Sequence, residues 1–240
     1  MASKEKINRF LERVIEANVL AVIFCLPFSK SLVEICVTVS IVFFIVKCFY
    51  LPGSFKAGRS VLIALSAFFL FNAVSLYNSQ FLNLSLPALV SKVAKWVVFF
   101  LAVSSVAKDR AALRRVFFTM LASAALILFD AFWQQFITGK DFLHFPNGYP
   151  VFKFHARKTG GMSFPTASFP YPNDFASWIN VYLFTFLALG IFDLKGRGDR
   201  VFRIVVIALC VVLAFFLFLT TSNGALLGAF VSSCLIVLVS

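Results

Sequence analysis

The chain has few charged residues. Only 13% of its 240 residues are Asp, Glu, Lys or Arg, against roughly 25% in soluble proteins. Hydrophobic residues make up 61% of the chain, and the mean hydropathy is +0.94. These values exclude an ordinary soluble domain and indicate a protein of the lipid bilayer.

Acidic residues are especially scarce. There are 10 Asp and Glu against 22 Lys and Arg, so the net charge is +12. In a soluble domain this excess would indicate a nucleic-acid partner. Here most basic residues lie in short clusters between long apolar runs, which is the pattern that sets membrane topology. We therefore expect no nucleic-acid partner.

Cysteine and histidine are also few. The chain has five cysteines and two histidines, and every cysteine lies in or at the end of an apolar run. This pattern indicates neither a disulfide framework nor a zinc site, and we expect no metal and no cofactor. The cysteines are Cys25, Cys36, Cys48, Cys210 and Cys234.

Eight apolar runs predict an all-α polytopic bundle that forms a single integral membrane domain over residues 1–240. A helix needs roughly 20 apolar residues to cross the hydrocarbon core. The first run is short and contains Pro27, so it could instead form a re-entrant hairpin with the second. The predicted spans are 17–29, 31–50, 60–77, 86–106, 116–136, 174–194, 201–219 and 223–240.

The basic clusters predict that the N-terminus lies in the cytoplasm, because Lys and Arg are enriched in cytoplasmic loops. With this orientation fifteen of the 22 basic residues lie inside. Lys30 and four residues of a long loop lie outside, and Lys92 and Lys95 fall within the fourth span. The fifteen are Lys4, Lys6, Arg9, Arg13, Lys47, Lys56, Arg59, Lys108, Arg110, Arg114, Arg115, Lys195, Arg197, Arg200 and Arg203.

The one long loop, about 137–173, lies on the predicted outer side. Its many Gly and Pro residues argue against regular structure, and its aromatic residues favour a loop that lies on the membrane interface. It carries Lys140, Lys153, Arg157 and Lys158. Function is expected in this loop because its charges are kept on the outer side.

Three segments resemble the superfamily of O-antigen ligases, O-antigen polymerases and protein O-oligosaccharyltransferases. The resemblance covers about 115–230 by motif and the first half of the chain by hydropathy alone, so it concerns the N-terminal part of such proteins. The segments are Gln135-x-x-x-Gly139-x-Asp141, Arg157-x-Thr-Gly160 leading to Pro172-Asn173-x-x-Ala176, and Leu219-Thr-Thr-Ser222-Asn-Gly224-Ala-Leu-Leu-Gly228.

The resemblance implies transfer of a glycan from an undecaprenyl-pyrophosphate carrier to an acceptor hydroxyl on the outer face of the bacterial inner membrane. The acceptor would be lipid A core, a growing glycan or a protein. Negative charge grows on the departing pyrophosphate, so cationic groups are required at the headgroup plane. The catalytic base stays unassigned, since His155 is as readily a headgroup contact.

Arg157 is the residue best suited to the pyrophosphate, because a guanidinium presents a planar fork to phosphate oxygens. Lys158 lies beside it. The alternative is that both residues bind anionic lipid headgroups. Lys92 and Lys95 lie one turn apart near the predicted outer end of the fourth span. They could face the same pyrophosphate, or they could snorkel to the interface.

Six other residues are expected to be structural groups near this site. We favour Asp130 as the partner of a basic residue, and Gln135 belongs to the first motif. Asn173 is expected to cap the sixth span, with Asp174 at the positive end of its dipole. Ser222 and Asn223 are expected to cap the eighth.

Two features favour alternatives to an active transferase. Asn223 stands where the family usually has Arg, and the chain stops at Ser240 within an apolar run, so an inactive truncated homologue is one alternative. We expect residues 1–240 alone to bind the donor without transferring its glycan. A transporter or flippase of lipid-linked or anionic solutes is the other alternative, and it would require polar groups or broken helices near the midplane.

Overall fold

The computed structural model describes residues 2–53, 55, 58–107, 109–143, 152–154, 162–193 and 200–239. Side chains are described within these ranges except at 2–3, 78, 152–154, 162–164, 189–193, 200–203 and 234–239. The chain divides into two compact units, Met1–Thr119 and Met120–Ser240. Helix α6 crosses from the first unit into the second.

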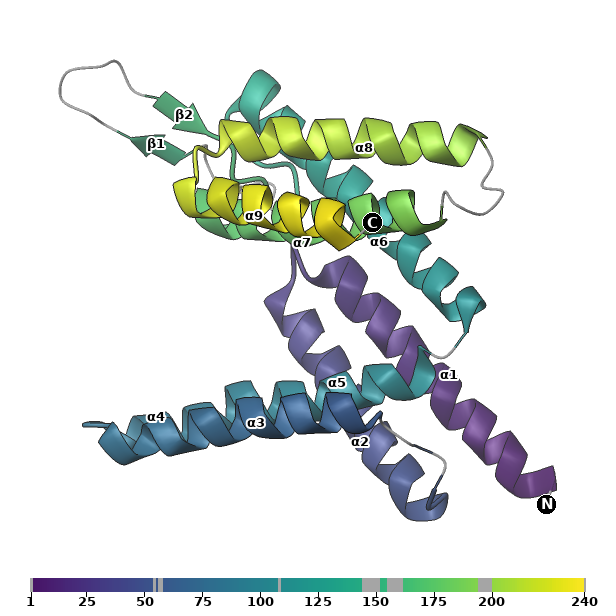
Figure 1. The fold of residues 1–240 in the computed structure, drawn as a ribbon. Helices are drawn as coiled ribbons and strands as arrows, with labels where there is room; N and C mark the ends of the chain where they lie inside the picture. The colour runs from purple at the N-terminus through teal and green to yellow at the C-terminus, as the bar shows by residue number, and fades with distance from the viewer. Residues whose placement is uncertain are drawn as a thin grey trace. The chain divides into compact units, whose positions relative to one another are not determined.

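All the secondary-structure elements described in the first unit are helices (Figure 1). Pro87 interrupts the fourth apolar run, and a π-helical segment follows it, so this run consists of three consecutive helical parts. The elements are α1 (Ala2–Cys25), α2 (Lys30–Tyr50), α3 (Arg59–Ser75), a 3-10 turn (Leu76–Asn78), α4 (Leu82–Ala88), the π segment (Leu89–Ala94) and α5 (Lys95–Val106).

The second unit contains most of α6, a small hairpin and three further helices. Strands β1 and β2 are antiparallel, with Phe152 opposite Phe164. The elements are α6 (Arg110–Trp133), a second π segment (Gln134–Thr138), β1 (Phe152–Phe154), β2 (Met162–Phe164), α7 (Pro172–Asp193), α8 (Arg200–Leu219) and α9 (Asn223–Val239).

The all-α class is confirmed, and a helix lies at each of the eight predicted spans. The expectation of eight membrane spans is not met. Within the described residues, three helices are long and apolar enough to cross a membrane: Lys30–Tyr50, Leu82–Val106 and Arg110–Thr138. Helix α3 has 17 residues, and α1 carries charges through its N-terminal half. Three such helices are typical of a multi-pass membrane protein.

The long loop is more regular than its composition predicts. The expectation of no regular structure between 137 and 173 is wrong, because the β1–β2 hairpin lies within this range. The Gly and Pro residues that argued against structure lie outside the two three-residue strands. The helix before the loop is also longer than predicted, since its π segment continues to Thr138.

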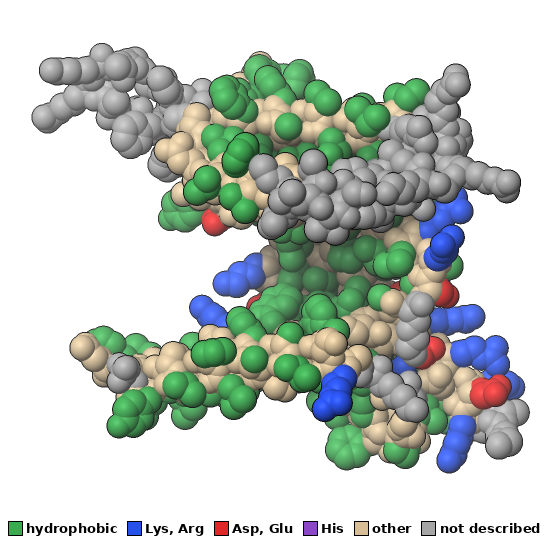
Figure 2. Space-filling model, in the orientation of Figure 1, with side chains coloured by type: hydrophobic (Ala, Val, Ile, Leu, Met, Phe, Trp, Pro, Cys, Tyr) green, Lys and Arg blue, Asp and Glu red, His purple; other side chains and the backbone are tan. Residues whose placement is uncertain are grey.

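A hydrophobic core joins α1, α2 and α5 of the first unit. Helix α1 contributes Ile15, Val19 and Val22, which recur every three to four residues and therefore share one face. They pack with Val33, Val37 and Phe44 of α2 and with Phe99 and Ala102 of α5. Around the N-terminal half of α1 the surface is charged instead, and Figure 2 shows Lys, Arg, Asp and Glu side chains there.

Ion pairs link α1 to two other helices at this charged end. The Lys47 Nζ atom of α2 lies 2.7 Å from Glu12 Oε1, and the Lys47 side chain is fully buried while Glu12 is 29% exposed. Arg115 of α6 donates through Nε and Nη2 to Glu16 Oε1, both at 2.6 Å. A buried ammonium group requires such a partner because losing its hydration is costly.

Helix α7 is the centre of the second unit. Its buried aromatic residues Phe175, Trp178, Tyr182 and Phe186 recur every three to four positions, so they form one stripe. The Trp178 and Tyr182 rings stack with centroids 4.1 Å apart. The Tyr182 hydroxyl donates to Ser123 Oγ of α6 at 3.4 Å, and Phe175 packs edge-on against Phe216 of α8.

The Glu12–Lys47 pair provides a test of this packing. Glu12→Leu leaves the buried Lys47 ammonium without its carboxylate, so we expect a loss of about 3 kcal/mol in the free energy of unfolding. The double variant Glu12→Leu/Lys47→Leu is expected to recover most of that loss. The measurement is unfolding of the purified protein in detergent, followed by circular dichroism.

The matched control is Glu5→Leu. Glu5 and Arg9 form an exposed pair at 3.9 Å, and such pairs contribute at most about 1 kcal/mol. Equal losses for Glu12→Leu and Glu5→Leu would contradict a structural role for the buried pair.

Candidate functional site

The candidate site lies at the end of the second unit where the hairpin, the start of α7 and the turn from α8 to α9 come together (Figure 1). The start of α7 carries Pro172–Ala176 of the second motif, and the turn from α8 to α9 carries the third. Buried polar side chains gather at the same end. They are Asp130, Gln134, Asp141, Thr166 and Ser168, and we call them the polar cluster.

Gln134 is the main clamp of the polar cluster. Its side chain is fully buried, and its Oε1 atom accepts hydrogen bonds from the backbone N–H groups of Thr166 and Ala167, both at 2.8 Å. Its Nε2 atom donates to Thr166 Oγ1 at 2.9 Å and to the Ala167 carbonyl at 3.4 Å. One amide therefore uses both its donor and acceptor groups to hold residues 166–167.

The clamped turn has an unusual backbone conformation. Ala167 has a φ of 46°, in the left-handed region that costs a residue with a Cβ atom roughly 1–2 kcal/mol. It is also completely buried. The Gln134 bonds offset this cost, and they fix the direction in which the chain leaves β2 and enters α7.

Asp130 holds the other side of the loop. It lies one turn before Gln134 on α6 and is fully buried, and its Oδ1 atom accepts a hydrogen bond from the Phe142 amide at 2.6 Å. We expected Asp130 to pair with a basic residue, and the structure shows this backbone bond. Asp141, the last residue of the first motif, precedes Phe142 in the sequence and is also buried.

The helix caps differ from the prediction at Asn173 and at Asn223, each of which lies inside its helix. Helix α7 begins at Pro172, and the Tyr171 carbonyl accepts hydrogen bonds from the amides of Asp174 and Phe175. Asn173 is therefore the second residue of the helix and not its cap. Asp174 lies in the first turn, where a carboxylate complements the helix dipole, and both side chains are exposed.

The turn from α8 to α9 lies against α7. Thr221 has a φ of 50°, and the Ser222 carbonyl accepts a hydrogen bond from Leu226 at the start of α9. Asn223 is the first residue of α9 and is exposed. Asn180 of α7 donates to the Ala225 carbonyl at 2.9 Å, which ties the third motif to α7.

Of the four cationic candidates, two lie outside the described residues and two belong to the first unit. Arg157 and Lys158 lie outside the described residues, as does His155. Lys92 and Lys95 belong to the first unit. Lys95 forms an ion pair with Glu34 of α2, and its Nζ atom lies 5.9 Å from the centre of the Trp96 ring. Lys92 is exposed in the π segment.

The residue that the sequence assigns to the site is Gln135, which is half-buried, whereas its neighbour Gln134 is the central residue of the polar cluster. The available signal was the position of Gln134 one turn after Asp130, which places both polar side chains on one helix face. No group of three or more His, Cys, Asp or Glu able to hold a metal ion lies within the described part of the chain.

Comparison with known proteins adds no identification, since no family model, no curated protein and no solved structure matches this chain.

The Gln134 clamp predicts a local effect. Gln134→Leu removes the acceptor of two buried N–H groups, and each unsatisfied group costs about 1–3 kcal/mol. We expect faster hydrogen exchange at Thr166 and Ala167 and a lower unfolding temperature. The same substitution at exposed Gln80 is the control and should change neither. Unchanged exchange at Thr166 and Ala167 in Gln134→Leu would show that the clamp is not what holds the turn.

Proposed function

We propose that this chain is a membrane glycosyltransferase-type protein of the O-antigen ligase and polymerase superfamily. It would move a glycan from an undecaprenyl-pyrophosphate carrier to an acceptor hydroxyl on the outer face of the bacterial inner membrane. One observation carries the proposal beyond the resemblance. Contacts among α6, the 165–171 segment, α7, α8 and α9 bring the described parts of the three motif segments to one end of the second unit.

The polar cluster serves this chemistry by positioning rather than by reaction. Asp130 fixes Phe142, and Gln134 fixes Thr166 and Ala167. These contacts hold the two sides of the segment that carries Arg157 and Lys158. The proposed reaction needs cationic donors that are in place before charge develops, and such preorganisation is usually the largest single contribution to catalysis.

In the proposed reaction the acceptor oxygen attacks the anomeric carbon of the donor sugar. The bond from that carbon to the pyrophosphate oxygen breaks, and the electron pair leaves with the pyrophosphate. The acceptor proton passes to a base that is not assigned. Arg157 would stabilise the pyrophosphate with its planar fork, and Lys158 would add a second positive charge. The acceptor would be lipid A core, a glycan or a protein.

Lys92 and Lys95 are weaker candidates for the pyrophosphate than Arg157 and Lys158. The Lys95 charge is balanced by Glu34. The pair of lysines therefore supplies one net positive charge, whereas a pyrophosphate carries at least two negative charges.

A transporter or flippase is the second candidate function, and the first unit offers an observation in its favour. Pro87 and the π segment Leu89–Ala94 interrupt the helix Leu82–Val106. Lys92, Lys95 and Glu34 place ionisable groups at this interruption. Interrupted helices with charged groups inside a span are typical of transporters.

An inactive homologue is the third candidate, because Asn223 stands where the family usually has Arg.

The test is Arg157→Ala in the native protein, reconstituted with an undecaprenyl-pyrophosphate-linked glycan. We expect donor binding to weaken and transfer to fall about 100- to 1,000-fold, as on loss of one preorganised donor. Arg157→Lys should retain little activity because it lacks the fork.

The matched control is Arg197→Ala, which removes an arginine predicted to lie on the cytoplasmic side. It should bind donor and transfer glycan as the unmodified protein does, with equal abundance in the membrane. Full donor binding and transfer in Arg157→Ala would leave only a headgroup-anchor role for this residue. Transport of the lipid-linked glycan without transfer would favour the second function.

A further inference from the structure

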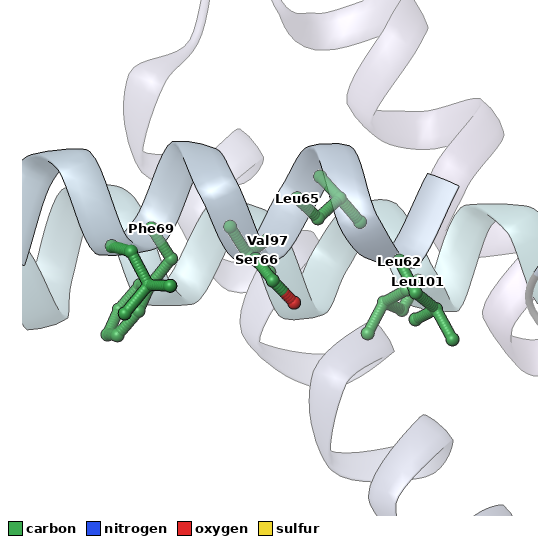
Figure 3. A pocket seen from close by; sticks show the side chains of 7 residues that line it. Leu62, Leu65, Ser66, Phe69, Val97 and Leu101 are labelled. Carbon is green, nitrogen blue, oxygen red and sulfur yellow. The ribbon is translucent and has the colours of Figure 1, made fainter. Parts of the chain in front are cut away.

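An apolar groove of about 400 Å³ runs between α3 and α5 in the first unit (Figure 3). It is lined by hydrophobic side chains apart from Ser66. Leu62 lies beside Leu101 at one end, Ser66 lies beside Val97 in the middle, and Phe69 marks the other end. Along the groove α3 and α5 are therefore antiparallel.

The α3 helix leaves this groove open to its surroundings. No side chain of Arg59–Ser75 is buried, and Ile63, Phe68 and Phe71 are more than half exposed. An apolar surface of this kind marks a site of contact with membrane or protein. In a membrane-spanning unit the medium around such a helix is the hydrocarbon chains of lipids.

The shape of the groove favours a flexible hydrocarbon chain over another helix. Helices in membranes pack closely where small residues line the contact. Leu62, Phe69, Val97 and Leu101 are bulky, and Ser66 is the sole small residue in the lining. A single lipid chain is thin enough to lie between these side chains.

Lys92 supplies a charge near the Phe69 end of the groove. It lies five residues before Val97 in the helical segment Leu82–Val106, and so about 7 Å further along the axis. Its side chain is exposed. Lys95 is paired with Glu34, whereas Lys92 has no ion-pair partner among the described residues. The local net charge is therefore +1.

The depth of Lys92 is compatible with a lipid headgroup. The helix Leu82–Val106 has 25 residues, so it is about 37 Å long against a hydrocarbon core of roughly 30 Å. Arg59 and Arg110 flank the opposite end of the α3 and α5 pair, which places the excess of about 7 Å at the Leu82 end. Lys92 then lies about 8 Å below the boundary, and its long side chain can snorkel upward.

We infer that Lys92 and the groove between α3 and α5 form a binding site for one anionic phospholipid of the bilayer. The phosphate of the headgroup contacts the Lys92 ammonium, and one acyl chain lies along Leu62, Ser66, Phe69, Val97 and Leu101. The single net positive charge matches a phosphodiester with one negative charge. This site lies in the first unit and does not depend on glycan transfer.

The experiment uses phosphatidylglycerol and phosphatidylcholine that carry a photoreactive group in the acyl chain, with the unmodified protein in vesicles. Crosslinked positions are mapped by mass spectrometry. We expect crosslinks within residues 62–70 and 97–101. Phosphatidylglycerol should crosslink about fivefold more than phosphatidylcholine, because one Lys near the membrane surface contributes about 1 kcal/mol of attraction to an anionic lipid. Lys92→Gln should remove the preference, and Ser66→Phe, which fills the groove, should reduce crosslinking by both lipids.

The matched control is Lys30→Gln, which removes an exposed cation at the start of α2 and should keep the preference. Equal crosslinking by both lipids in the unmodified protein would overturn the proposal, as would a preference that survives Lys92→Gln. Unlabelled polyprenyl phosphate is added as a competitor. Displacement by it at a far lower mole fraction than by phosphatidylglycerol would assign the groove to a carrier lipid and overturn the phospholipid assignment.

Discussion

The first unit depends on ion pairs between charged side chains of different helices. Hydrocarbon does not solvate an ammonium or a carboxylate, so each charge inside the unit requires a partner or a route to the surface. Glu12 pairs with Lys47, Glu16 with Arg115, and Glu34 with Lys95. Each pair joins two different helices, and together the pairs connect α1, α2, α5 and α6. Lys92 has no ion-pair partner among the described residues, and for this residue we infer an anion from outside the chain.

The second unit meets the constraint with hydrogen bonds to the backbone. Gln134 and Asp130 lie on one face of the helix that leads to the long loop, and both side chains bond to loop amides. The fully buried Ala167 turn, with its positive φ, persists because Gln134 holds it. In this way a helix face fixes the two sides of a loop whose composition alone gives no fixed path. The proposed transfer chemistry requires fixed donors of this kind.

Particular residues show how far the sequence could predict this fold. The helices follow the apolar runs to within a few residues, because hydropathy and the Pro and Gly residues between runs are local signals. The extension of α1 to Ala2 was not predicted, since its charged half has no apolar run. The π segments and the partners of Lys47 and Lys95 depend on packing between helices, so no local pattern reveals them.

In the candidate site too, local signals could be predicted and packing could not. The segments of the site could be predicted from the sequence, because Gly, Pro and polar residues mark the ends of α6 and α7. It selected Gln135 over Gln134, because the difference between them is burial on one helix face against the 166–167 turn. It placed the cap of α7 at Asn173, whereas Tyr171 accepts the first amide bonds. One-residue differences of this kind are decided by tertiary contacts.

The central claim is that the end of the second unit receives the donor pyrophosphate. The most direct measurement is crosslinking with a lipid-linked glycan whose photoreactive group lies next to the pyrophosphate, in the native protein reconstituted in vesicles. We expect labelled peptides between Gln134 and Pro172, centred on Arg157. Labelling confined to the helix around Lys92 and Lys95 would contradict it and would indicate a path for the donor through the first unit.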